Sequence, residues 1–315
     1  MMHRVYRNTK FFLLSLFYTY IIKYGIFLFG RRDDRVMKYR ISLCLIFKNE
    51  APFLKEWIDY HRTIGIDHFY LYNNNSTDNY NEVLKDYLDQ GLVTLIEFPY
   101  NHAQMRAYEH CYETFKTETN WIGFFDADEF ICPHIHNNIN DWLSKFSKFH
   151  SVLIYFHGFG TGGRLKHDYN KNVIEQYFNC WPTIHNWGKC FVNTRFIISN
   201  YNTPGLHHST RTYVNLLGFR ISLPPINQFG SICPCSYVLG GVDGKLKKAD
   251  ICVNHYFTKS WDIYKKKMNQ TDVFFEKNPK MDINYFYIHE EKCVARDYTI
   301  TRFLIRMKLL QNKIV

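Results

Sequence analysis

Two aspartates stand at alternate positions directly after an apolar run, in the segment Trp121-Ile-Gly-Phe-Phe-Asp-Ala-Asp-Glu-Phe130. If the strand continues through Asp126 and Asp128, both carboxylates leave the same face, because successive side chains of a strand alternate. Mg²⁺ and Mn²⁺ prefer oxygen ligands and keep open positions for substrate phosphates, so two carboxylates suffice to hold such an ion against a diphosphate. A solvated, acidic end of a strand has the same short sequence pattern. The surrounding sequence is needed to distinguish a metal site from such a strand end.

Apolar runs and helical periodicities alternate through the first half of the chain. Strands are expected in the run that leads to Asp126 and at 40–49, 66–72, 92–98 and 152–156, with helices at 50–65, 83–91, 103–115 and 139–149. Strands that alternate with single helices predict an α/β fold with a mostly parallel, Rossmann-like sheet and helices on both faces. Ligands of such sheets bind at the carboxyl ends of the strands.

Polar clusters follow three of these strands, at 48–50, 73–78 and 126–129. Because the carboxyl ends of parallel strands meet at one edge, the three clusters are expected to converge on a single site. Some of these residues have a local role as well, and Asp78 is well placed as the N-cap of the helix near Val83.

The same segments resemble glycosyltransferase family 92, which is related to the family 2-like glycosyltransferases and implies a GT-A fold. The resemblance covers residues 40 to 270 and is dense as far as Pro133. It rests on Ile46–His61, Gly65–Asp78, Gly91–Leu95, Gln104, Ala107-Tyr108 and the Asp-x-Asp run, then on Phe159-Gly160, Val173-Ile-Glu175, Lys189 and Asn254–Ser260. The family usually has Asp where this chain has Asn73, so a charged contact to the nucleoside becomes a neutral hydrogen bond there.

The resemblance implies a metal-dependent transfer of a sugar, with galactose as a candidate, from a UDP-linked donor to a glycan or glycolipid. The implied metal, Mn²⁺ or Mg²⁺, would be held by Asp126, Asp128 and His255, although a hydrogen-bonded core histidine is the plain alternative for His255. Gln104 and Arg106 would reach the phosphates, and a solvated helix face is equally open for Arg106. The residues expected at the nucleotide are Lys48, Asn49, Glu50, Asn73, Ser76, Gln104 and Lys259.

Family 92 also implies inversion at the anomeric carbon, by one displacement with one general base. Two carboxylates follow the fifth expected strand and its glycine-rich turn at 158–163, which is suited to close approach by an acceptor. Glu175 fits the family landmark, and Asp168 lies nearer the turn. Glu129 adjoins the metal acids but is expected on the opposite face of the strand.

Composition leaves other classes of function open. A chain of 315 residues can bury one large α/β core with additions. A net charge of +10 suits anionic lipid, an acidic glycan or nucleic acid. No nucleic-acid motif is present, and a nucleic-acid partner would leave the Asp-x-Asp run unexplained, so we expect no nucleic-acid partner.

The alternative functions are a sugar-nucleotide hydrolase or nucleotidyltransferase, and a basic, membrane-attached glycan- or nucleic-acid-binding protein without catalysis. The nine cysteines include no Cys-x-x-Cys pair and no zinc-like spacing, and the close pair Cys233-Pro-Cys235 is expected to be a reduced loop.

The termini are expected to contact a membrane. The chain divides into a membrane-associating N-terminal segment with an apolar helix (1–38), the GT-A domain (39–290) and a C-terminal amphipathic helix (291–315), for which packing onto the domain is the alternative. Sequons at Asn74 and Asn75 would place glycans in the nucleotide site. The cytoplasmic face of the membrane is therefore favoured, with a Golgi type II membrane protein as the alternative.

Overall fold

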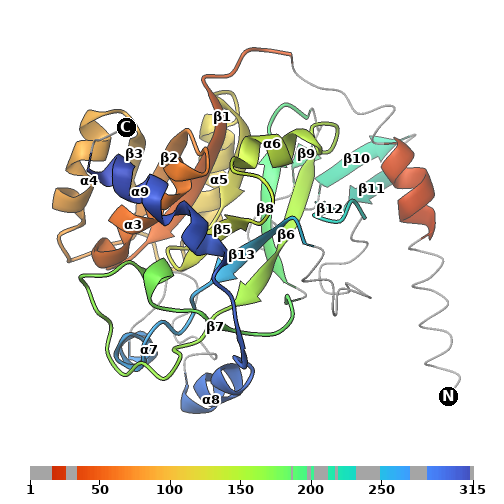
Figure 1. The fold of residues 1–315 in the computed structure, drawn as a ribbon. Helices are drawn as coiled ribbons and strands as arrows, with labels where there is room; N and C mark the ends of the chain where they lie inside the picture. Colours follow the sequence, from red (N-terminus) through yellow and green to blue (C-terminus); the bar gives the residue numbers. More distant parts are fainter. Residues whose placement is uncertain are drawn as a thin grey trace, which may run out of the picture.

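A nine-stranded sheet forms the centre of the protein, which we describe from a computed structural model (Figure 1). The described residues are 16–25, 34–185, 187–196, 200–201, 212–216, 219–231, 249–269 and 282–312. The strand order is β3-β2-β1-β4-β8-β6-β13-β5, and β12 pairs with β6. The strands are β1 Tyr39–Phe47, β2 His68–Asn73, β3 Val93–Glu97, β4 Thr119–Phe124, β5 Glu129–Pro133, β6 Ser151–Gly158, β8 Gly188–Asn193, β12 Ile226–Asn227 and β13 Ile251–His255.

The predicted α/β class and its parallel half are confirmed. Strands β3, β2, β1 and β4 pair in parallel, as do β6 and β13. Two antiparallel strands were not predicted: β8 joins β4 to β6, and β5 lies at the edge beside β13. β5 escaped prediction because the chain turns at 125–128, inside what reads as one apolar run.

Helices cover both faces of the sheet, and β1 shows why. Its residues are buried almost throughout, and they alternate between two cores. Leu43 and Leu45 pack with α3 (Ala51–Thr63) and α4 (Tyr80–Asp89). Cys44 and Ile46 pack instead with α5 (Gln104–Phe115). A strand buried on both faces reads as a continuous apolar run, which is typical of parallel sheets.

The loop after β2 caps a different helix from the one expected. Asp78 Oδ2 accepts a hydrogen bond of 2.8 Å from the backbone amide of Ala51, at the start of α3. The N-cap of α4 is Asn79, whose side chain makes no capping bond. The prediction that Asp78 caps the helix near Val83 is therefore wrong. Its actual role joins the loops that follow β1 and β2.

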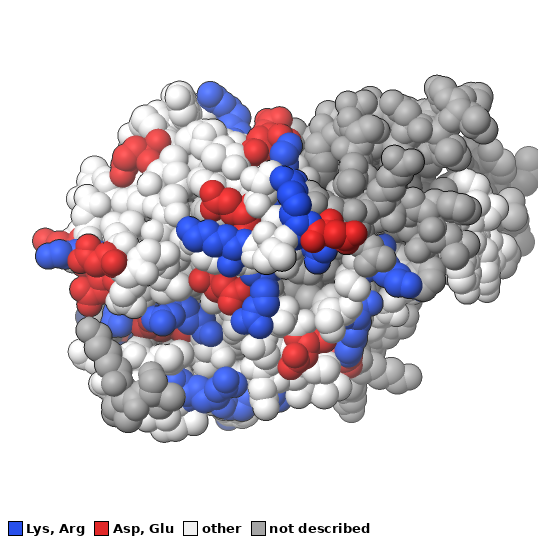
Figure 2. All heavy atoms as spheres, turned by 90° about the horizontal axis from the view of Figure 1, so that it is seen from above, with Lys and Arg blue, Asp and Glu red and all other residues white. Residues whose placement is uncertain are grey.

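Shorter elements complete the described chain. They include α6 (Ile139–Ser144), the 3₁₀ turn η2 (Val173–Glu175), α7 (Trp261–Met268) and α8 (Ile283–Glu291). Two small sheets lie apart from the main one: β9 (Asn200–Tyr201), β10 (Thr212–Leu216) and β11 (Phe219–Leu223) form one, and β7 (Asn179–Cys180) with β14 (Ala295–Arg296) forms the other. On the face seen in Figure 2, basic and acidic side chains are interspersed, and the basic ones form no continuous stripe among the described residues.

The C-terminal apolar stripe is packed onto the domain. It begins in the 3₁₀ turn η4 (Thr299–Phe303) and continues through α9 (Leu304–Gln311). Phe303 and Met307 are buried, and Phe303 meets the ring of Tyr60 on α3. These two side chains are packed onto the domain, whereas Leu304 and Leu310 of the same stripe are partly exposed. Membrane contact by this C-terminal segment stays a prediction.

The N-terminal segment is described only from 16 to 25, where the π-helical turn η1 covers Phe17–Ile22. The rest of the apolar helix expected within 1–38 lies outside the described residues. Residues 34–38 are described and lead into β1. In the part of the chain that is described, no helix is long and apolar enough to cross a membrane. Membrane contact by this segment stays a prediction.

Candidate active site

Asp126 and Asp128 lie in the turn between β4 and β5. The expectation that both carboxylates leave one face of a strand is wrong, because β4 ends at Phe124. The two acids instead face different partners. Asp126 turns towards α5 and β8, and Asp128 turns towards β13 and α7. The turn thus presents two distinct carboxylates at one edge of the sheet.

Asp126 is held by three side chains. Its Oδ1 accepts hydrogen bonds of 3.0 Å from Gln104 Nε2 and 3.0 Å from Tyr108 Oη, both on α5. Its Oδ2 lies 2.9 Å from Lys189 Nζ, on β8. About a third of the side chain remains exposed, at 31%. Gln104 therefore contacts the Asp126 carboxylate, and its role at a phosphate stays a prediction.

Glu129 lies on the same side of the turn as Asp126, contrary to the expectation of an opposite face. Its Oε2 accepts the backbone amide of Asp126 at 2.9 Å and lies 3.2 Å from Lys189 Nζ. Lys189 is fully buried, and Glu129 is 1% exposed. Burial raises the pKa of Glu129 well above its usual range, and Lys189 acts in the opposite direction. Lys189 thus compensates two carboxylates inside the protein.

Asp128 faces a lysine and a histidine. Lys267 Nζ of α7 donates to its Oδ2 at 2.6 Å, and His255 Nε2 lies 3.6 Å from its Oδ1. Burial favours a protonated carboxyl here, yet Lys267, His255 and Lys259 outweigh burial and hold the pKa of Asp128 well below its usual range. Asp128 is therefore a carboxylate at neutral pH.

The pairing of β5 with β13 brings two of the three predicted metal ligands, Asp128 and His255, together, and leaves Asp126 outside the group. His255 is directly opposite Glu129 in the antiparallel register. Ligand atoms of Asp128, Glu129 and His255 lie within 4.8 Å of one another. Two carboxylates and an imidazole are a donor set that suits Mn²⁺. In the structure Asp128 and His255 therefore fit the metal prediction, with Glu129 in the position that was expected of Asp126.

Lys259 lies beside this group in an unusual conformation. Its backbone has φ of 48°, which is uncommon for a lysine. The side chain is 1% exposed, and its ammonium has no hydrogen-bond partner among the described residues, although it lies 4.3 Å from the centre of the Phe53 ring. Burial and the charge of Lys267 lower the pKa of Lys259 to about 8. A buried cation without an anionic partner points to an anionic ligand.

The loops after β1 and β2 are bonded to each other. The backbone amide of Asn49, at φ of 57°, donates to Ser76 Oγ at 2.9 Å. Glu50 is partly exposed, and burial raises its pKa against the opposing charges of Lys259 and Lys267. Lys48 is partly exposed as well. These contacts confirm the expected convergence of 48–50 with 73–78 at one edge, whereas the role of these residues at a nucleotide stays a prediction.

Asn73 is occupied within the protein. Its Nδ2 donates to Glu97 Oε2 at 2.7 Å, and its Oδ1 accepts the amide of Ser76 at 2.9 Å. Glu97 ends β3 and also accepts from Tyr80 Oη at 3.1 Å. The amide of Asn73 therefore joins β2 to a carboxylate that the sequence pattern did not single out.

The two predicted general bases are bonded elsewhere. Glu175 accepts from Lys308 Nζ at 2.5 Å and from Asn172 Nδ2 at 2.7 Å, where it closes a capping box. Asp168 is partly exposed, and its carboxylate lies 3.6 Å from Lys171 Nζ. Among the described residues, the hydrogen bonds and ion pairs of these two acids do not reach the group around Asp128.

Another acid, Glu290, reaches the glycine-rich turn. Its carboxylate accepts the amide of Thr161 at 3.0 Å, the hydroxyl of Thr161 at 2.6 Å and the hydroxyl of Thr258 at 3.1 Å. A Cβ on Gly160 would lie 2.8 Å from Glu290 Oε1, so glycine there permits this close approach. Because the amide of Phe159 also donates to the carbonyl of His255 at 3.0 Å, the turn is tied to β13.

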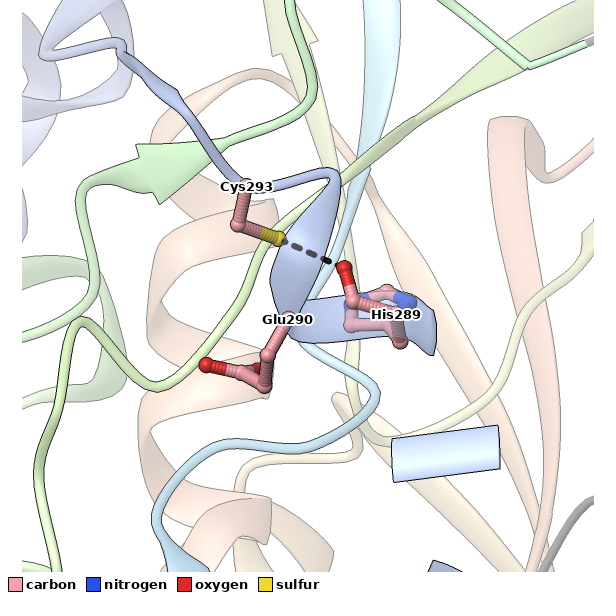
Figure 3. Close-up of side chains that lie close together, drawn as sticks. All are labelled: His289, Glu290 and Cys293. Atoms are coloured by element: carbon pink, nitrogen blue, oxygen red, sulfur yellow. Dashed lines mark hydrogen bonds between the residues drawn. The ribbon is translucent and has the colours of Figure 1, made fainter. Parts of the chain in front are cut away.

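Glu290 belongs to a small cluster with His289 and Cys293 at the end of α8 (Figure 3). Ligand atoms of the three lie within 4.8 Å of one another. Each group nevertheless has a partner in the protein. His289 Nε2 is 3.0 Å from the carbonyl of Phe159, and the Cys293 thiol donates to the carbonyl of His289 at 3.4 Å. The cluster therefore fastens α8 to the glycine-rich turn.

Comparison with known proteins identifies the family of the chain. Residues 39–291 match the family model described as glycosyltransferase family 92. The chain therefore belongs to glycosyltransferase family 92.

Two similar proteins come from plants. A glycosyltransferase family 92 protein of Ricinus communis is 26% identical over 243 residues, which are 76% of this chain and 38% of the relative. Galactan beta-1,4-galactosyltransferase GALS3 of Arabidopsis thaliana is 31% identical over 133 residues, 38% of this chain and 26% of the relative. The chain thus spans well under half of each of these proteins.

Solved structures give weaker likenesses. S. aureus TarS 1-349 in complex with UDP has a TM-score of 0.33 at 12% identity, covering 49% of this chain and 47% of that one. Glucosyl-3-phosphoglycerate synthase from Mycobacterium tuberculosis, in complex with Mn²⁺ and UDP, has a TM-score of 0.28 at 15% identity, covering 50% and 57%. Likenesses this distant identify no substrate.

Sequence reasoning missed the lysines that hold the two acids. Lys189 was noted only as a family landmark, and Lys267 was not considered. A signal for Lys267 exists: it is the third residue of the run Lys265-Lys266-Lys267, four residues after Ile263, so a helix over 261–268 turns it towards the buried side.

Proposed function

We propose that the chain is a metal-dependent glycosyltransferase that moves a sugar from a nucleotide-sugar donor, UDP-linked, to a glycan or glycolipid. The observation that supports this most is the carboxylate, carboxylate and imidazole group of Asp128, Glu129 and His255 beside the unpartnered cation of Lys259. A divalent ion and a diphosphate require such a pair of neighbouring sites. Galactose is the candidate sugar, since a relative is named for galactosyl transfer.

Sugar transfer breaks the bond between the anomeric carbon and the diphosphate oxygen and forms one to an acceptor oxygen. Negative charge grows on the leaving diphosphate. When bound at Asp128, Glu129 and His255, the metal supplies Lewis-acid stabilisation of that charge. Lys259 faces the same region and adds an ammonium group, which replaces water around the phosphate oxygens. Asn49, Glu50 and Ser76 shape the edge where we propose that the nucleoside lies.

The acceptor hydroxyl loses its proton to a general base. We propose Glu290 ahead of Glu175 and Asp168 for this role, because its carboxylate is fixed at the turn that is bonded to β13. Loss of a general base costs about 10²-fold or more in rate. Glu290→Gln is therefore expected to lower transfer by about 10²-fold with UDP affinity little changed, as measured by initial rates and calorimetry.

Glu175→Gln and Asp168→Asn are the matched comparisons, since both acids are paired with surface lysines. If Glu175→Gln is the inactive variant and Glu290→Gln transfers normally, the base predicted from the sequence is the right one. The rate of transfer falls at low pH because the general base becomes protonated. If Glu290→Gln shows the same fall in rate at low pH as the wild type, Glu290 is excluded as the general base.

The lowered pKa of Lys259 predicts how donor affinity depends on pH. A lysine binds diphosphate strongly only as an ammonium, so affinity for UDP is expected to fall as pH rises through about 8. Below that pH the group is already charged, and affinity is expected to level off. Calorimetric titration of UDP at about pH 7 and about pH 9 measures the change. The Lys259→Met variant is expected to bind UDP more weakly, with an affinity that no longer falls as pH rises through about 8. The exposed Lys55→Met variant is expected to keep this pH dependence.

The function is tested by incubating the protein with a panel of nucleotide sugars and measuring UDP release with and without oligosaccharide acceptors. The proposal expects one UDP-sugar to be consumed faster when an acceptor is present. A sugar-nucleotide hydrolase would release UDP at the same rate in both cases, and a binding protein would release none.

A further inference from the structure

We infer that Lys267 is an exchangeable cation of the site: it neutralises Asp128 in the empty protein and moves to the donor's diphosphate when Asp128 takes up a divalent ion. The inference rests on the proposed function and adds that binding of the metal and binding of the nucleotide are coupled through Lys267. Metal and nucleotide are then expected to bind much more tightly together than either does alone.

The contact of Lys267 with Asp128 occupies the carboxylate that a metal would need. The ammonium lies 2.6 Å from Oδ2, while His255 lies 3.6 Å from Oδ1. A divalent ion and an ammonium group do not share one carboxylate closely, because two positive charges at such a short distance repel each other strongly in a partly buried site. Metal binding at Asp128 therefore requires Lys267 to leave.

Lys267 is less enclosed by the protein than Lys189. Lys267 is 17% exposed and sits near the end of α7, and its second contact is a 3.3 Å bond to the carbonyl of Phe257. Lys189 is fully buried on a central strand between two carboxylates. Of the two lysines that hold the acidic turn, Lys267 is thus the one with access to solvent and to a ligand.

The region beside Asp128 is already positively charged, so an anion bound there could also receive the displaced ammonium of Lys267. Lys259 lies buried without a partner, and its charge and that of Lys267 repel each other. Two neighbouring ammonium groups, one of which has no hydrogen-bonded acid, are stabilised when a diphosphate lies between them. Lys267 would therefore leave Asp128 for an anion that also satisfies Lys259.

This exchange predicts the sign of two binding changes. Without nucleotide, Lys267 competes with the metal, so Lys267→Met is expected to raise the affinity for Mn²⁺ by about tenfold. With UDP present, Lys267 contributes to binding, so the same variant is expected to reduce the synergy between Mn²⁺ and UDP by about tenfold or more, the usual range of coupling between two ligands.

The experiment titrates Mn²⁺ by electron paramagnetic resonance, with and without UDP, in the wild type, Lys267→Met and Lys267→Gln. Lys266→Met is the matched control: it removes the same charge from the same helix, but its side chain is exposed. Circular dichroism checks that each variant is folded. The inference expects tighter Mn²⁺ binding and lost synergy in both Lys267 variants and little change in Lys266→Met.

Two outcomes separate the inference from the proposed function. If the wild type binds Mn²⁺ and UDP but the Lys267 variants behave like Lys266→Met, or bind Mn²⁺ more weakly without nucleotide, the exchange is refuted and the proposed function stands. If the wild type binds neither Mn²⁺ nor UDP, the proposed function itself fails.

Discussion

Asp128→Asn is expected to lower sugar transfer by about 10³-fold while the protein stays folded. An amide in place of the carboxylate loses most of the charge that holds a divalent ion, and the metal contributes several kcal/mol to stabilising the leaving diphosphate. Each 1.4 kcal/mol is worth about tenfold in rate. The measurement is UDP release at saturating donor, with Mn²⁺ added and with chelator.

Asp126→Asn makes a useful comparison because the two acids have different partners. Asp126 is bonded to Gln104, Tyr108 and Lys189, so its amide variant loses the pairing with Lys189 and disturbs the turn as well as the site. Loss of activity is expected here too, accompanied by lower stability. Near-normal transfer by Asp128→Asn in chelator-treated buffer would contradict the metal assignment.

Lys189→Met is expected to destabilise the protein by about 3–5 kcal/mol, the usual cost of leaving a buried charge without its partner. The lysine is fully buried and compensates both Asp126 and Glu129. Urea unfolding measures the loss. Because burial already raises the pKa of Glu129, that group would take up a proton more readily without Lys189, so the loss is expected to shrink as pH falls.

Two controls make the Lys189 result specific. The double variant Lys189→Met with Glu129→Gln removes an acid together with its partner and is expected to recover part of the stability. Lys145→Met breaks a more exposed pair with Asp250 and is expected to cost at most about 1 kcal/mol. A Lys189→Met protein as stable as the Lys145→Met protein would show that the buried pair is not needed.

The parallel half of the sheet was predictable because its signals are local. β1, β2 and β3 are rich in apolar residues, and each is followed by a helix with buried residues. The convergence of 48–50 with 73–78 then follows from topology alone. The antiparallel strands carry no such signal, because their partners lie far away in the chain, and Glu129 reads as part of the preceding run.

The geometry around the two aspartates was less predictable for a physical reason. Alternation of side chains holds only within a strand, and the chain turns between Phe124 and Glu129. Which acid meets His255 depends on the register of β5 against β13, which no local pattern reveals. The inward turn of Lys267 likewise depends on the exact start of α7.

The central claim is that Asp128 and its neighbours hold a divalent ion against a nucleoside diphosphate. Calorimetric titration of UDP into the protein, with Mn²⁺ and with chelator, tests it most directly when wild type and Asp128→Asn are compared. We expect the wild type to bind UDP at least about tenfold more tightly with Mn²⁺, and Asp128→Asn to lose that difference. Equal UDP affinity with and without Mn²⁺ in the wild type, or a metal effect that survives in Asp128→Asn, would contradict the claim.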